Sequence, residues 1–100
     1  MSFGVFLHPK AARFLKKADS SLRKTIREDL VGLANSPEEK GEQLIHSPFW
    51  RLRVGDYRVI YEIDREHGRV VVLFIGHRRD VYDEFSRLLG DGISFELPAR

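Results

Sequence analysis

The spacing of apolar residues predicts a strand followed by two helices in the first third of the chain. Residues 3–7 alternate well enough for a strand, and Pro9 suits the first turn of a short helix. The second helix is expected to begin at Ser20 or Ser21 as its N-cap and to end near Asn35. Its apolar positions recur every three or four residues, at Leu22, Ile26, Leu30 and Leu33.

The middle of the chain predicts a loop and then a hairpin. Residues 36–48 are polar and contain two prolines, so we expect a loop there. Residues 49–54 and 57–63 alternate as two strands. Gly55 and Asp56 lie between them and suit a type II′ turn, which prefers glycine at its first central position.

The last third predicts a buried strand and a final helix. Residues 69–75 are an unbroken apolar run, which is typical of a central strand covered on both faces. Asp80 is a suitable N-cap for a helix that Gly90 would close. The apolar face of that helix would hold Val81, Phe85, Leu88 and Leu89. Residues 91–100 have no strong pattern and are expected to form an edge strand or an unattached tail.

The predicted order of elements is strand, helix, helix, strand, strand, strand, helix. This order gives an α+β domain in which an N-terminal strand and a helical hairpin pack on a mostly antiparallel sheet, with a short C-terminal helix. One hundred residues with 42% apolar content suit one such domain. We place it at residues 1–90, with residues 91–100 as the tail.

Composition excludes several classes of protein and site. The chain contains no cysteine, so it has no disulfide framework, thiolate metal site or thiol nucleophile. No apolar run approaches the roughly 20 residues that span a bilayer, and the N-terminus lacks the pattern of a secretory leader. We therefore expect a cytoplasmic protein without a membrane partner.

The distribution of basic residues says more than the net charge of +2. Every lysine lies at or before Lys40, and the chain after it carries nine arginines. Guanidinium groups match phosphate with a planar fork and can stack on bases, so this set favours a nucleic acid as partner. The alternative is a compositional bias towards arginine without functional meaning.

The predicted hairpin brings two arginines face to face. A turn at Gly55 and Asp56 would pair Arg53 with Arg58 across the two strands. Like charges at opposite positions destabilise a ladder, within the roughly 0.2–1 kcal/mol that such pairs contribute. We therefore expect an anion to bind between them.

The candidate site extends from this pair along one face of the sheet. Arg51 shares the face of Arg53 by alternation, and the strand ending near Gly76 would deliver His77 or Arg78 beside the hairpin. Such a set is a phosphate-binding patch with one group that titrates near neutral pH. The alternative is a solvated polar face on which Asp and Glu residues neutralise the arginines.

The alternative for His77 is a hydrogen-bonded structural residue, which is the more common role of a lone histidine at a strand end. The other histidines lack metal-ligand spacing, and no glycine-rich phosphate loop is present, so we expect no metal site. By alternation Trp50, Tyr57 and Tyr61 fall on the inward side and are expected in the core. Tyr82 is predicted off the apolar stripe of the last helix and is a candidate for the cleft.

Two segments of this chain resemble a known family. WRLRVGDYRVIYEI, an apolar strand and IGHRRDVY follow a strand and a helical hairpin, an arrangement similar to the RelE/ParE toxin superfamily of toxin–antitoxin pairs over about residues 3–89. The resemblance implies a RelE-like fold. For the RelE branch it also implies an endoribonuclease that cuts messenger RNA in the ribosomal decoding site and so inhibits translation. The adjacent ribose 2′-hydroxyl would attack the phosphate without metal or cofactor.

The resemblance also assigns roles to individual residues. Arg51 and Arg53 occupy the positions of two family lysines, Arg58 matches the arginine of a GxYR segment, and Arg78 matches the arginine after the last core strand. Tyr82 is the counterpart of a base-stacking tyrosine, although the spacing here is shorter. We expect Arg51, Arg79 and Tyr82 to bind substrate.

The chemistry needs a base and an acid in addition to charge stabilisation. Arginine retains its proton, so it readily supplies charge stabilisation alone. Other members of the superfamily use a histidine, and we expect His77 to move the proton while Arg58, Arg78 and Arg53 complete the catalytic set.

The resemblance leaves two other functions open. The ParE branch shares the architecture and inhibits DNA gyrase. A module without toxic activity that only binds its antitoxin is a further alternative, because the family lysines are missing. The expected partners are a cognate antitoxin and, for the nuclease, the ribosome with its message.

Overall fold

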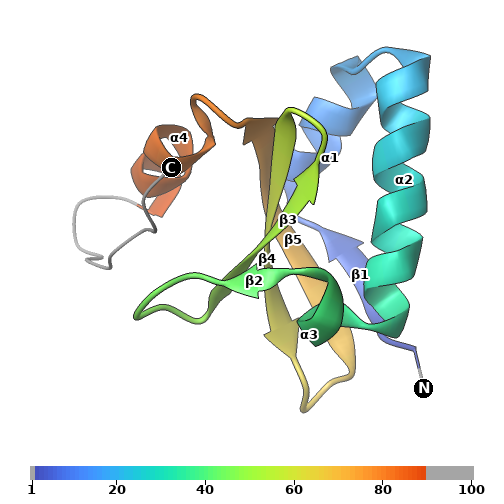
Figure 1. Ribbon diagram of the computed structural model, residues 1–100, viewed down its shortest axis with the longest axis vertical. Coiled ribbons are helices and arrows are strands. Elements are labelled where there is room, and N and C mark those ends of the chain that lie inside the picture. The colour runs from blue at the N-terminus through green and yellow to red at the C-terminus, as the bar shows by residue number, and fades with distance from the viewer. Residues whose placement is uncertain (1, 90–100) are drawn as a thin grey trace.

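The computed structural model describes residues 2–89, except the side chains of Glu84, Ser86, Leu88 and Leu89. Figure 1 shows a sheet with helices on two sides. The elements are β1 (Gly4–Leu7), α1 (Pro9–Lys17), α2 (Ser20–Asn35), α3 (Pro37–Lys40), β2 (Glu42–Gln43), β3 (Phe49–Val54), β4 (Tyr57–Asp64), β5 (Arg69–His77) and α4 (Val81–Leu89). The predicted closure of the last helix at Gly90 and the predicted tail at 91–100 lie outside the described residues.

The five strands form one sheet in the order β1-β5-β4-β3-β2. β1 runs parallel to β5, and the other neighbouring strands are antiparallel. In Figure 1, α1 and α2 lie on one side of the sheet and α4 lies on the other. The predicted α+β class and the mostly antiparallel sheet are confirmed.

The register of the β3–β4 hairpin is the predicted one. Val54 lies opposite Tyr57, and Arg53 lies opposite Arg58. The turn depends on Gly55, whose φ of 59° lies in the left-handed region that glycine adopts without strain. Because the register follows from the turn, the two arginines have no alternative pairing within this hairpin.

Both faces of the sheet carry a buried cluster. On the face of α1 and α2 the cluster contains Ala11, Leu15, Ile26, Leu30, Leu33, Leu52, Val54, Val59, Tyr61, Val70, Val72 and Ile75. On the face of α4 it contains Leu44, Ile60, Phe74, Val81, Tyr82 and Phe85. β5 contributes to both, which confirms the prediction of a central strand covered on both sides.

The N-cap of α2 differs from the predicted one. Asp19 holds this position, because its Oδ1 accepts the backbone N–H of Leu22 at 2.9 Å. Ser20 is already the first helical residue. Aspartate and serine are nearly equal as N-caps, so the sequence alone did not separate them.

Residues 36–48 are not the continuous loop that the sequence predicted. They contain α3 and β2, and β2 pairs Glu42 with Arg51 of β3. α3 begins with Pro37 and is held by a contact with β4. The buried hydroxyl of Tyr61 donates a hydrogen bond to the Pro37 carbonyl at 2.6 Å. These elements are too short to have a periodic signal, and contacts with the sheet stabilise them.

Gly41 connects α3 to β2 where the backbone passes close to β3 and β4. A Cβ atom built on Gly41 would overlap the Tyr61 hydroxyl and lie 2.8 Å from the Arg51 carbonyl oxygen. We expect Gly41→Ala to lower the free energy of unfolding by about 1–3 kcal/mol through overpacking. Urea denaturation would measure the change.

Gly32→Ala is the matched control, because its Cβ would meet only Lys40 Cε, at the ordinary distance of 3.9 Å. We expect this helical substitution to stabilise the protein by about 0.5–1 kcal/mol. Equal effects of the two alanines would contradict the packing described around Gly41.

Candidate functional site

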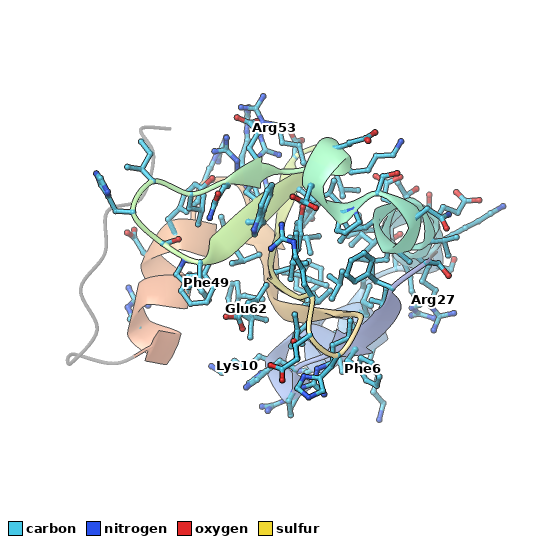
Figure 2. The ribbon with its side chains drawn as sticks, turned by 90° about the horizontal axis from the view of Figure 1, so that it is seen from below. Phe6, Lys10, Arg27, Phe49, Arg53 and Glu62 are labelled. Carbon is cyan, nitrogen blue, oxygen red and sulfur yellow. The ribbon has the colours of Figure 1, made fainter. Side chains whose placement is uncertain are left out.

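Four arginines gather at the hairpin end of the sheet, and we call Arg51, Arg53, Arg58 and Arg78 the arginine cluster. Arg53 and Arg58 lie directly opposite each other on β3 and β4, and Arg51 shares their face of the sheet. Figure 2 shows Arg53 at the outer surface beyond β3. Its side chain is 64% exposed, whereas that of Arg51 is 8% exposed. The cluster therefore has a solvent-facing part and a buried part.

One carboxylate reaches two members of the cluster. Glu42 Oε1 lies 3.3 Å from Arg51 Nη2 and 3.9 Å from Arg53 Nε. β2 places Glu42 there because it is the partner of Arg51 in the ladder. A single oxygen within reach of both side chains means that the two guanidiniums converge on one anionic position.

Arg58 has its guanidinium at the turn of the hairpin. Its Nη1 donates to the carbonyl oxygens of Gly55 and Tyr57, both at 2.8 Å. Among the side chains that the structure describes, no carboxylate forms an ion pair with it. Partial burial lowers the pKa of Arg58, and repulsion from Arg53 lowers it further. The guanidinium keeps its proton at ordinary pH, so an anion bound beside it would relieve this repulsion.

Arg78 completes the cluster from the end of β5. Its backbone N–H donates to the Asp56 carbonyl at 2.8 Å, and its Nε lies 3.7 Å from Asp56 Oδ1. The charge of Arg78 also contributes to the lowered pKa of Arg58. The sequence prediction that the end of this strand lies beside the hairpin is confirmed.

Arg51 and Tyr82 are predicted to bind substrate, but the structure places both in the interior. Arg51 Nη1 donates to the Tyr82 hydroxyl at 2.7 Å, and the two residues are 7% and 2% exposed. Tyr82 packs with Val81 and Phe85, so its predicted place off the apolar stripe is wrong. A nine-residue helix is too short for periodicity to fix which of two adjacent residues faces inward. In this arrangement the pair holds α4 on the sheet.

His77 lies on the other face of the sheet from Arg53 and Arg58. The register pairs it with Tyr57, and the two rings are 5.5 Å apart, edge to face. Gly76 is the residue opposite Arg58, so alternation turns its neighbour His77 towards α1. His77 Nδ1 accepts the backbone N–H of Arg79 at 3.2 Å, and Arg79 is exposed. The structure thus gathers the four arginines without His77.

Glu42 is the residue of this site that sequence reasoning missed. It lay in the segment predicted as a loop, where no periodicity indicated a strand or its pairing partner. Its position depends on the pairing of β2 with the edge of the sheet, which is a tertiary contact and not a local feature of the sequence.

In residues 2–89 no group of three or more His, Asp or Glu side chains is arranged to hold a metal ion. In the same residues no helix is both long and apolar enough to cross a membrane.

Comparison with known proteins places the chain in a family. The sequence model described as "ParE toxin of type II toxin-antitoxin system, parDE" matches residues 5–82. The chain belongs to the RelE/ParE superfamily of type II toxin–antitoxin toxins. Toxin RelG of Mycobacterium tuberculosis is 53% identical over 30 residues, which are 30% of this chain and 34% of that protein. That match therefore spans about a third of the length of RelG.

Solved structures of RelE toxins share the fold. The crystal structure of the RelBE2 toxin–antitoxin complex from Mycobacterium tuberculosis matches with a TM-score of 0.73 and 30% identity, over 78% of this chain and 100% of that one. The isolated E. coli RelE toxin matches with a TM-score of 0.69 at 22% identity, over 88% and 99% of the two chains. The archaeal RelE–RelB complex from Pyrococcus horikoshii gives 0.67 at 24% identity, over 78% and 97%. The predicted RelE-like fold is confirmed.

The bond between Arg51 and Tyr82 generates a prediction about stability. Arg51 Nε is already buried without a hydrogen-bond partner in the described residues, so the Tyr82 hydroxyl is one of the few groups that satisfy this charge. Tyr82→Phe should lower the free energy of unfolding by about 1–3 kcal/mol, because Arg51 Nη1 loses its acceptor. Chemical denaturation would measure it.

Tyr57→Phe is the control, since no hydrogen bond within residues 2–89 involves the Tyr57 hydroxyl. If Tyr82→Phe and Tyr57→Phe changed the free energy of unfolding equally, the buried hydrogen bond between Arg51 and Tyr82 would not be what holds α4 on the sheet.

Proposed function

We propose that this RelE/ParE-family toxin is an endoribonuclease that cuts messenger RNA on the ribosome and thereby inhibits translation in the cytoplasm. The observation that carries the proposal is the arginine cluster. Arg53 and Arg58 are held opposite each other, and Arg51 and Arg53 converge on one carboxylate of Glu42. A phosphodiester carries its negative charge on oxygens that could replace that carboxylate. The solvent-exposed Arg53 is the side of the cluster from which RNA would enter.

The reaction that suits this site is transfer within the RNA itself. The ribose 2′-hydroxyl attacks the adjacent phosphorus, a bond forms between O2′ and phosphorus, and the bond from phosphorus to the 5′-oxygen of the next nucleotide breaks. The products are a cyclic phosphate and a 5′-hydroxyl end. Arg53, Arg58 and Arg78 would stabilise the extra negative charge of the transition state. Arg79 would bind the substrate next to them.

Proton transfer remains assigned to His77. Of the four histidines, it alone lies at the hairpin end of the sheet, because His8, His46 and His67 lie in other parts of the fold. Its ring faces Tyr57, so it reaches the phosphate only if the end of β5 turns. The proposal therefore includes a rearrangement of residues 77–80 when RNA binds.

A cognate antitoxin is the proposed protein partner. The solved RelE relatives from Mycobacterium tuberculosis and Pyrococcus horikoshii are toxin–antitoxin complexes. This chain offers a groove of about 590 Å3 between β1, α1 and α2, with Lys16 and Arg27 among its lining residues. Leu7 and Val31 line it and are 38% and 67% exposed. An amphipathic antitoxin segment with acidic residues would fit this mixture of apolar and basic groups.

Inhibition of DNA gyrase is the second candidate. It is favoured by the ParE description of the family whose sequence model matches. Such an inhibitor would not require phosphate contacts at Arg53 and Arg58. The two functions therefore predict different effects of substitutions in the cluster.

The test replaces Arg53 and Arg58 by alanine, singly and together. As an RNase, the toxin should lose about 10²–10³-fold in cleavage rate for each arginine that stabilises the transition state. Mapping of transcript 5′ ends after induced expression, with ribosome-bound message as template, would measure it. Arg65→Ala is the control, because Arg65 is exposed and pairs with Glu38 elsewhere on the surface.

Three outcomes separate the functions. Loss of cleavage in the cluster variants but not in Arg65→Ala supports the nuclease. Full toxicity of the cluster variants together with a DNA-damage response supports gyrase inhibition. Normal growth on induction of the unmodified chain, with intact message, would indicate a module that only binds its antitoxin.

A separate substitution tests the proton carrier. If His77 transfers a proton, His77→Ala should slow cleavage by about 10²–10⁴-fold. The pH–rate profile should also change shape, because one of the groups that transfer protons is removed. A loss of only a few-fold with an unchanged profile would remove His77 from the mechanism while leaving the arginines in place.

A further inference from the structure

α1 is the most one-sidedly charged element of the described structure. It carries Lys10, Arg13, Lys16 and Lys17 and no acidic residue, and residues 1–18 contain neither Asp nor Glu. In residues 2–89 none of these four cations forms an ion pair with a described side chain. The helix therefore presents uncompensated positive charge to the solvent, unlike Arg51, Arg53 and Arg78 of the cluster.

Three of these cations line a hollow with aromatic walls. The hollow has a volume of about 430 Å3 and lies between α1, the start of α2 and the sheet. Lys10, Arg13 and Lys17 line it together with Phe14 and Tyr57, and we call it the α1 hollow. The rings of Phe14 and Tyr57 meet at 5.7 Å in an edge-to-face arrangement, and both residues are only partly buried.

The one acidic residue in the lining does not cancel this charge. Asp19 Oδ1 accepts the backbone N–H of Leu22 as the N-cap of α2, and Asp19 forms no ion pair within the described residues. The α1 hollow thus combines three lysine or arginine side chains with the partly buried rings of Phe14 and Tyr57 and with one carboxylate that already accepts a backbone hydrogen bond.

The hollow and the arginine cluster meet around one end of the sheet. Tyr57 lines the hollow, and the next residue, Arg58, belongs to the cluster on the opposite face. His77 packs against Tyr57 on the same face of the sheet as the hollow. Figure 2 shows Lys10 and Arg53 on opposite sides of the molecule, so one ligand can touch both only by passing around the hairpin end.

We propose that the α1 hollow is a second RNA-binding subsite, which takes phosphates on Lys10, Arg13 and Lys17 and a base against Phe14 and Tyr57. The RNA segment runs from the arginine cluster around the Gly55 turn into the hollow. This subsite rests on the proposed ribonuclease function and extends it. Cationic side chains combined with aromatic rings are the usual means of binding single strands without sequence preference.

RNA fits the hollow better than an acidic peptide does. A peptide helix needs a continuous apolar strip, and the groove between β1, α1 and α2 supplies one with exposed Leu7 and Val31. The α1 hollow instead offers partly buried rings surrounded by three cations. The two sides of α1 are therefore assigned different ligands, which is what the experiment separates.

The test compares two triple variants with the same change of charge. Lys10→Gln, Arg13→Gln and Lys17→Gln empty the α1 hollow of cations. Lys16→Gln, Lys24→Gln and Arg27→Gln remove as many charges from other positions on α1 and α2. The probe is a short single-stranded RNA with 2′-O-methyl groups, which lacks the attacking hydroxyl and so stays intact during the measurement.

We expect the first triple to bind this RNA at least ten-fold more weakly than the second. For the first triple, the slope of log affinity against log salt concentration should become shallower by about 0.7 for each phosphate that the variant no longer neutralises. Tyr57→Leu should weaken binding several-fold without changing the salt slope, because it removes a ring and no charge. Purified ribosomes form a second arm: an effect on ribosome binding alone assigns the hollow to ribosomal RNA, and an effect on the short RNA assigns it to message.

Other results would overturn the subsite. Equal weakening by both triples would mean that only net charge matters, and loss of antitoxin binding by the first triple with unchanged RNA binding would make the hollow a protein-docking site. If wild type cleaves message and the first triple binds and cleaves like the second, only the subsite fails. If wild type binds neither RNA nor ribosomes, the proposed nuclease fails with it.

Discussion

The register of the β3–β4 hairpin is the constraint on which the site depends. Gly55 at φ 59° sets the turn, and the turn places Arg53 opposite Arg58. A slip of one residue would move every side chain of β3 to the other face of the sheet, so the buried Leu52 and Val54 also oppose any change. The apolar core thus enforces a repulsive pair on the surface, and the repulsion remains available to be relieved by an anion.

The sheet has two covered faces, and this divides the arginines into different roles. α4 packs over Ile60 and Phe74 and buries Arg51, which becomes a support for Tyr82. Arg53 lies beyond the cover of α4 and keeps its side chain in solvent. An arginine buried against Tyr82 and a solvent-exposed arginine therefore lie two residues apart on one strand.

Charge is distributed around the hairpin end rather than on one face. The arginine cluster lies on the side of α4, and the cations of α1 lie on the other side, together with Tyr57 and His77. A long polyanion could engage both sides, whereas a single phosphate could engage only one. The proposed path of the RNA depends on this arrangement of charge.

The sequence by itself determined the α+β class, the hairpin register, the burial of β5 and the arginine set, because each depends on short-range periodicity or on one turn residue. It did not reveal β2, the bridging Glu42, the burial of Tyr82 or the face of His77. These were decided by tertiary structure. A two-residue strand and the rotation of a short helix carry no periodic signal, and the face of a residue at a strand end depends on which neighbour pairs with it. Only the packed sheet fixes those pairings.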